Sequence, residues 1–84
     1  MKKATTKDEL FLLKLYEMAL KEGNEKTPFD RLRVGRAIGQ NDRGTYVITR
    51  DLAQANFIKK AGEEAVCLTD HGLRLVAQLK QQGL

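Results

Sequence analysis

The sequence is poor in the residue types that build disulfides and metal sites, because it has one cysteine, Cys67, and one histidine, His71. A lone cysteine forms no internal disulfide, which fits a reducing compartment. A structural zinc site needs about four nitrogen or sulfur ligands, more than these two side chains supply. We therefore expect neither a metal centre nor another cofactor.

Long apolar runs are also missing, and no stretch approaches the roughly 18 residues that cross a bilayer. The first residues, Met1-Lys2-Lys3, lead into a polar segment instead of an apolar signal segment. We expect a cytoplasmic protein. The 84 residues suffice for one small core, so we expect residues 1–5 to form a flexible tail and residues 6–84 a single domain.

Patterns of catalytic residues are scarce as well. The single histidine follows its only plausible nucleophile at close range, so there is no Ser-His-acid order. Gly35, Gly39 and Gly44 lack the Lys and Ser or Thr that complete a phosphate-binding loop. Glu63 and Glu64 are neighbours in a predicted turn, which indicates an exposed pair instead of a buried dyad. We expect no enzymatic activity.

The first predicted helix covers residues 7–22. Thr6 and Glu9 have the spacing of a capping box, in which a hydroxyl and a carboxylate satisfy free backbone N–H groups. Gly23 is expected to end the helix in the left-handed conformation.

Apolar side chains cover a broad face of this helix. One track holds Leu10, Leu13, Tyr16, Glu17 and Leu20, and it is flanked by Phe11, Leu12, Leu15, Met18 and Ala19. Phe11, Leu12 and Leu15 make the face wider than one core needs. We therefore expect part of it to contact a second copy of the chain or another protein.

Two further helices are predicted on either side of a short polar turn. Thr27 and Pro28 give a cap and a first-turn proline for a helix over about residues 28–38. Asp42 is expected to cap a helix over residues 43–55. Two short helices joined by a tight turn form a helix-turn-helix.

The helix predicted over residues 43–55 has two tracks of different character. The inward track is Thr45, Ile48, Thr49, Leu52 and Ala55, and the outward track is Arg43, Tyr46, Val47, Arg50 and Gln54. Residues 43–60 carry four basic residues and one acid, in a chain whose net charge is +4. Positive charge concentrated on one segment attracts polyanions, and a solvated helix face is the alternative interpretation.

The pattern then changes from helical to extended. Asn56 tolerates the left-handed conformation and is expected to end the preceding helix. Residues 57–60 and 65–68 are predicted as two strands of a hairpin with a short turn. Thr69 is expected to cap a last helix that runs to about Gln82. Cys67 is interpreted as a buried small hydrophobe instead of a redox switch, and His71 as an exposed first-turn residue.

Two motifs stand out in this half of the chain. They are Leu52-x-x-x-Asn56-Phe57-Ile58-Lys59-Lys60 and Val66-x-Leu68-Thr69-x-x-Gly72-x-x-Leu75. Together they resemble winged-helix transcription regulators of the multiple-antibiotic-resistance and related classes, over residues 30–80. The family commonly has glycine where this chain has Asn56, whereas the Leu-Thr-x-x-Gly step is intact. The resemblance implies an α+β, mainly helical winged helix-turn-helix, with a three-helix core, a short two-stranded β-hairpin wing and a C-terminal helix.

The resemblance also implies binding of duplex DNA, with the helix over residues 43–55 in the major groove and a role in transcription regulation. Arginine can pair with guanine or phosphate, glutamine with adenine, and tyrosine can contact phosphate or a thymine methyl. Arginines of the preceding helix would contact phosphate, as would one of two hairpin lysines on opposite strand faces. The predicted DNA-contacting residues are Arg33, Arg36, Arg43, Tyr46, Arg50, Gln54, Lys59 and Lys60.

An alternative interpretation stays open. Arg50 can pair with Asp51 or another acid, and Tyr46 can be half-buried packing. The predicted wing carries Glu63 and Glu64 where many relatives have basic residues, and acids in the minor groove would face phosphate. The chain would then be a winged-helix module for protein–protein interaction in a larger assembly, without direct DNA binding.

Overall fold

The structure is a computed structural model that describes residues 6–83. Its elements are α1 (Lys7–Glu22), β1 (Phe29–Asp30), α2 (Arg31–Ala37), α3 (Asp42–Gln54), β2 (Ile58–Lys60), β3 (Ala65–Leu68) and α4 (Asp70–Gln81). The strands form one antiparallel sheet in the order β1-β3-β2. The described part is therefore α+β and mainly helical. The tail expected over residues 1–5, like Leu84, lies outside the described residues.

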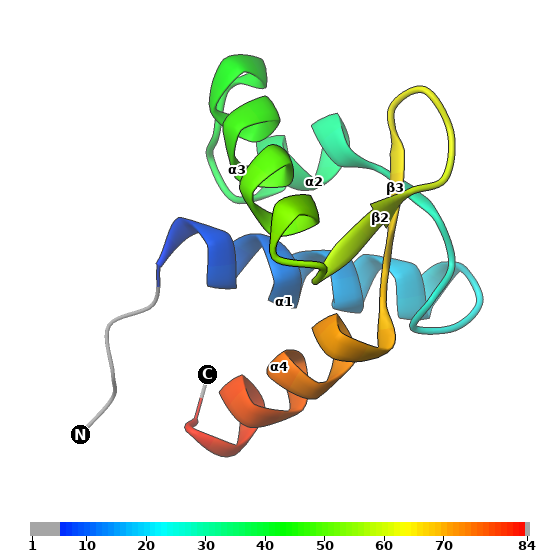
Figure 1. Ribbon diagram of the computed structural model, residues 1–84, viewed down its shortest axis with the longest axis vertical. Coiled ribbons are helices and arrows are strands. Elements are labelled where there is room, and N and C mark those ends of the chain that lie inside the picture. Colours follow the sequence, from blue (N-terminus) through cyan, green and yellow to red (C-terminus); the bar gives the residue numbers. More distant parts are fainter. Residues whose placement is uncertain (1–5, 84) are drawn as a thin grey trace.

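Helix α1 is the central support of the fold, because it packs against α2, α3, α4, β1 and β3. In Figure 1, α2, α3 and the turn of the β2–β3 hairpin lie on one side of α1, and α4 lies on the other. The buried core draws on all four helices and all three strands of residues 6–83; its main members are Phe11, Leu12, Leu15, Phe29, Val34, Ile48, Leu52, Ile58, Leu68 and Val76. No helix within residues 6–83 has both the length and the apolar character that crossing a membrane requires.

The start of α1 is confirmed and its predicted end is partly wrong. The Thr6 hydroxyl accepts the Glu9 N–H at 3.1 Å, and the Glu9 carboxylate accepts the Thr6 N–H at 3.0 Å. The helix ends at Glu22 as expected, but Gly23 has φ 173°, which is extended and not left-handed. The Gly23 N–H still donates to the Ala19 carbonyl at 3.1 Å, so the last turn closes without left-handed backbone.

The predicted contact surface on Phe11, Leu12 and Leu15 is wrong, because all three side chains are 0% exposed. Elements pack against α1 from several sides, and a central helix needs a wider apolar face than a helix at the surface. The exposed large apolar residues of α1 belong instead to the track that runs from Leu10 to Leu20. They are Leu10, which is 42% exposed, and Leu20, which is 47% exposed.

The helix predicted over residues 28–38 begins later, at Arg31, because a short strand precedes it. Phe29 pairs with Val66, so the residue after Pro28 belongs to the sheet. Asp30 caps α2 through its carboxylate, which accepts the Leu32 N–H at 2.8 Å. The sheet is consequently three-stranded, where the sequence pattern indicated two strands.

Helices α2 and α3 touch at a glycine. A Cβ built on Gly35 would lie 1.8 Å from the Thr45 Oγ1 atom, so only glycine allows this approach. Between the helices, Gly39 has φ +81°, the left-handed conformation that glycine adopts without strain. Asn41, and not Asp42 as expected, caps α3 by accepting the Gly44 N–H at 2.7 Å.

The corner between α3 and the hairpin is built as the sequence predicts. Asn56 is left-handed with φ 65°. Thr69 caps α4, and its hydroxyl donates to the Asn56 carbonyl at 2.6 Å. A Cβ on Gly72 would lie 2.0 Å from the Phe57 carbonyl oxygen, so α4 sits directly on the corner. The Leu-Thr-x-x-Gly step therefore docks α4 onto the corner that follows α3.

The expected environments of the two rare residues are confirmed. Cys67 is buried in β3, where it pairs with Lys59 of β2. His71 is exposed in the first turn of α4, and its ring stacks on Phe57 with centroids 4.5 Å apart.

Candidate nucleic-acid interface

Most of the predicted DNA-contacting residues that the fold brings together lie on the outward face of α3. Its five residues, Arg43, Tyr46, Val47, Arg50 and Gln54, are all exposed. The inward residues are buried except for Ala55, which is exposed because it forms the C-cap of α3 instead of its last turn. A row of two guanidinium groups, a phenol and an amide thus lies along one side of the helix.

The two arginines of this face differ in their neighbours. The Arg50 Nε atom lies 3.5 Å from a carboxylate oxygen of Asp51, so the pairing considered in the sequence analysis is present. Both side chains are largely exposed, and such surface pairs contribute little because water screens them. No carboxylate of residues 6–83 lies within ion-pair distance of Arg43. Both guanidinium groups therefore remain accessible to an anion.

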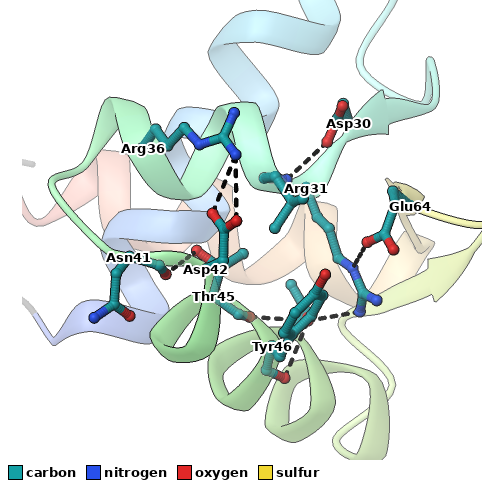
Figure 2. Close-up of polar contacts among 10 residues, drawn as sticks. Asp30, Arg31, Arg36, Asn41, Asp42, Thr45, Tyr46 and Glu64 are labelled. Atoms are coloured by element: carbon teal, nitrogen blue, oxygen red, sulfur yellow. Dashed lines mark hydrogen bonds and ion pairs between the residues drawn. The ribbon is translucent and has the colours of Figure 1, made fainter.

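The arginines of α2 have separate neighbours. Arg36 Nη2 donates to both carboxylate oxygens of Asp42 at 3.3 Å, which joins the last turn of α2 to the first turn of α3 (Figure 2). The Arg33 guanidinium lies 5.0 Å from the centre of the Phe29 ring. Both arginines are exposed. Of the two, Arg36 is the one in direct contact with α3.

The hairpin lysines are exposed and alternate between the two faces of β2. Lys60 pairs with Val66 and shares the strand face of buried Ile58, whereas Lys59 pairs with Cys67 on the opposite face. Lys59 lines a hollow of about 660 Å³, together with Lys26, His71, Arg74 and Asp70. The hydrogen bond and the charge of Lys26 hold the pKa of Asp70 below its usual range. Lys59 and Lys60 therefore lie on opposite faces of β2, and of the two only Lys59 lines this hollow.

Arg31 is the residue that sequence reasoning missed. Its Nε donates to the Glu64 carboxylate at 2.9 Å and its Nη1 donates to the Thr49 hydroxyl at 3.1 Å. Its guanidinium also lies 4.5 Å from the centre of the Tyr46 ring. Figure 2 shows Arg31 between Glu64 and Tyr46. The partners are 33 and 18 residues away in sequence, so no local pattern could have indicated these bonds.

The prediction that Glu63 and Glu64 form an exposed pair instead of a buried dyad is confirmed for Glu63 and only in part for Glu64, whose side chain is 43% exposed. Its carboxylate is bound by Arg31, and its residue is half-buried, whereas Glu63 is exposed. One of the two acids of the hairpin turn is therefore compensated by a cation of α2. The turn presents less free negative charge to a polyanion than the sequence indicates.

The part of the chain that the structure describes gathers no group of three or more His, Cys, Asp and Glu side chains suited to a metal ion. Comparison with protein-family models, curated proteins and solved structures found no match. The function has to be inferred from the chain's own geometry and chemistry.

Proposed function

We propose that this chain is a winged helix-turn-helix domain that binds duplex DNA, with α3 in the major groove, and that it regulates transcription. The element order supports the fold assignment: α2 and α3 are joined by a short turn, and the β2–β3 hairpin follows α3 directly. In this assignment α3 is the recognition helix and the hairpin is the wing. The sheet order β1-β3-β2 holds the hairpin onto the start of α2.

The single observation that carries the DNA-binding proposal is the exposed row on α3. A helix of 13 residues is about 20 Å long, and an α-helix fits the major groove, which is about 12 Å wide. Arg43 and Arg50 lie two turns apart in this row, with Tyr46 between them. Arginine forks match guanine edges and phosphates, and Gln54 has the donor and acceptor that adenine requires. The row thus offers groups for both base and phosphate contacts.

Cations beside α3 supply further phosphate contacts in this proposal. Arg36 lies where α2 meets α3, and Lys60 extends from the hairpin. Arg36 shares its charge with Asp42, so its contribution is smaller than that of an unpaired cation. Each phosphate contact releases condensed counterions, which makes binding depend on salt.

The test is the affinity of the chain for a short duplex of random sequence at about 50 and about 200 mM salt, measured by fluorescence anisotropy. Phosphate contacts predict a steep loss of affinity with salt. Arg50→Ala should weaken binding by about 1–3 kcal/mol, because it removes one charge-assisted contact. Its melting temperature should stay close to the parent's, since the Arg50 side chain is exposed.

Arg74→Ala is the matched control, because it removes the same side chain from an exposed position of α4, a helix that lies on the other side of α1 from α3 (Figure 1). This variant should bind nearly as well as the parent. If the parent does not bind duplex DNA at low salt, or if the two variants lose affinity equally, α3 is not the DNA-binding element.

A second candidate function is association through α1 and α4. A hollow of about 390 Å³ lies between these helices, lined by Leu13, Tyr16, Glu17, Leu20, Lys21 and Lys80. Its lining combines apolar side chains with one acid and two lysines, and the Lys80 Nζ atom lies 4.7 Å from the centre of the Tyr16 ring. A two-fold contact brings the same apolar lining of both copies together, including Leu20, which is 47% exposed. We propose a second copy of the chain as its occupant; an interaction module without DNA binding would use this same surface.

A further inference from the structure

Arg31 occupies the junction between the two elements that the proposed function places on DNA. It is the first residue of α2, and its side chain is only 18% exposed. It bonds Glu64, which directly precedes β3 of the hairpin, and Thr49 on the buried face of α3. Its guanidinium also covers one face of Tyr46, which belongs to the outward row of α3. One side chain therefore touches both the wing and the recognition helix.

Two further hydrogen bonds reinforce this junction, one between main-chain groups and one donated by the Thr49 hydroxyl. The Arg31 N–H donates to the Glu64 carbonyl at 2.9 Å, so Arg31 and Glu64 are joined by main chain and side chain. The Thr49 hydroxyl accepts from Arg31 and donates to the Thr45 carbonyl at 2.9 Å. The guanidinium is thus held by groups that are themselves hydrogen-bonded, which fixes its orientation.

We infer that Arg31 is a positioning residue, which sets the hairpin turn relative to α3 so that both elements meet the same duplex. This inference rests on the proposed function. The planar guanidinium donates in two directions at once, toward Glu64 and toward Thr49, which the single ammonium group of lysine does not reproduce. The stacked guanidinium also limits the positions of the Tyr46 ring.

The inference gives the two acids of the hairpin turn opposite roles. Glu63 is exposed, and no cation of residues 6–83 lies within ion-pair distance of it, so near DNA it acts only as a repelling charge. Glu64 repels DNA as well, but it also anchors Arg31. If charge alone mattered, removing either acid would strengthen binding equally. If Glu64 positions the hairpin through Arg31, removal of Glu64 weakens DNA binding.

The experiment compares Glu63→Ala and Glu64→Ala, which make the same change of charge at adjacent positions. We expect Glu63→Ala to bind random duplex DNA about twofold more tightly at low salt, as the loss of one repulsion about 10 Å away predicts. We expect Glu64→Ala to bind up to about twofold to threefold more weakly, because loss of the ion pair costs up to about fivefold and removal of the repulsion offsets about twofold of it. Melting curves should lie close together, because the Glu64 side chain is 43% exposed.

A double-mutant cycle separates positioning from direct contact with DNA. Arg31→Lys keeps the charge and should weaken binding in the parent, but it should cause a smaller loss in the Glu64→Ala background, where only the Thr49 bond and the Tyr46 contact remain to be lost. An equal loss in both backgrounds would mean that Arg31 itself contacts phosphate, which overturns the inference. Tighter binding by Glu64→Ala, parallel to Glu63→Ala, also overturns it while leaving the proposed function intact. A parent chain that does not bind DNA overturns both.

Discussion

At the scale of single residues, Asn56 stands out because it alone among the non-glycine residues of 6–83 has a positive φ. Its conformation turns the chain from α3 into β2, and its carbonyl accepts the Thr69 hydroxyl. One residue therefore sets the direction of the hairpin and receives the cap of α4. The position of the β2–β3 hairpin relative to α3 depends on both.

Asn56→Gly should be neutral or slightly stabilising, because glycine adopts the left-handed conformation without strain. Asn56→Val should cost on the order of 1 kcal/mol or more, because a β-branched side chain is strained there. Chemical denaturation of the three proteins measures the difference. Equal stability of the Gly and Val variants would remove the left-handed corner from this account.

Several residue-level predictions that depend on local chemistry succeeded, although the left-handed end at Gly23 and the cap at Asp42 were wrong. The capping box of Thr6, the corner at Asn56 and the cap at Thr69 each depend on neighbours within a few residues or on the residue's own conformational preference. The Arg31–Glu64 pair was not predictable in this way, because its members are joined only when β1 pairs with β3. Because Arg31 lies 33 residues before Glu64, no local sequence pattern indicated that Glu64 is paired.

At the scale of elements, two glycines allow helices to approach closely. Gly35 of α2 faces the Thr45 side chain of α3, and Gly72 of α4 faces the Phe57 carbonyl. The first contact sets how α2 meets α3, and the second sets how α4 supports the corner. Both glycines are therefore part of what positions the α3 face.

Gly72→Ala should destabilise the fold by roughly 1–3 kcal/mol, because the new Cβ meets backbone that can move only if α4 shifts. Gly35→Ala should also destabilise, but Thr45→Ala should recover part of that loss, since it removes the closest clashing atom. Denaturation midpoints measure both effects. Gly62→Ala is the control, because its Cβ would lie 3.3 Å from the Ala65 side chain and should cost less. A Gly72→Ala protein as stable as the Gly62→Ala protein would contradict the close docking of α4.

Sequence periodicity predicted the four helices of residues 6–83 and the hairpin. It misplaced the start of α2, which depends on the pairing of β1 with β3. Pro28 suits the first turn of a helix, but pairing of Phe29 with Val66 draws the next residue into the sheet. The strand β1 is only two residues long, so no alternation of side chains could reveal it. The start of α2 is consequently set by the cap at Asp30.

At the scale of the whole molecule, α1 separates two surfaces. The α3 face and the hairpin turn lie on one side of it, and α4 lies on the other (Figure 1). Phe11, Leu12 and Leu15 were expected at an interface because a wide apolar face looked excessive for a small domain. They are core because α1 is packed from several sides, which a helical pattern does not reveal.

The hollow between α1 and α4 predicts self-association. Leu20→Glu should shift the chain from dimer to monomer in sedimentation equilibrium, because it places a charge in an apolar contact. Leu10→Glu is the control: it changes an equally exposed leucine of α1 that does not line the hollow, and it should leave the dimer intact. A parent chain that is monomeric at high concentration would remove this second function.

The sequence predicted the composition of the candidate DNA-binding site better than its electrostatics. The outward row of α3 follows from helical periodicity, which is why Arg43, Tyr46 and Arg50 share one exposed face. The pairing of Arg36 with Asp42 and of Arg31 with Glu64 depends on how α2, α3 and the hairpin pack. Because Arg31 and Arg36 are paired with acids, the accessible arginines next to the hairpin are those of the α3 face, Arg43 and Arg50.

The most direct test of the central claim is NMR mapping of amide shifts in the isotopically labelled chain while a short random duplex is added at low salt. We predict that the largest changes fall on α3, from Asp42 to Gln54, and on the β2–β3 hairpin, while the amides around Leu13, Leu20 and Lys80 stay nearly unchanged. No change upon addition of DNA, or changes centred on the hollow between α1 and α4, would contradict the proposal that α3 binds DNA.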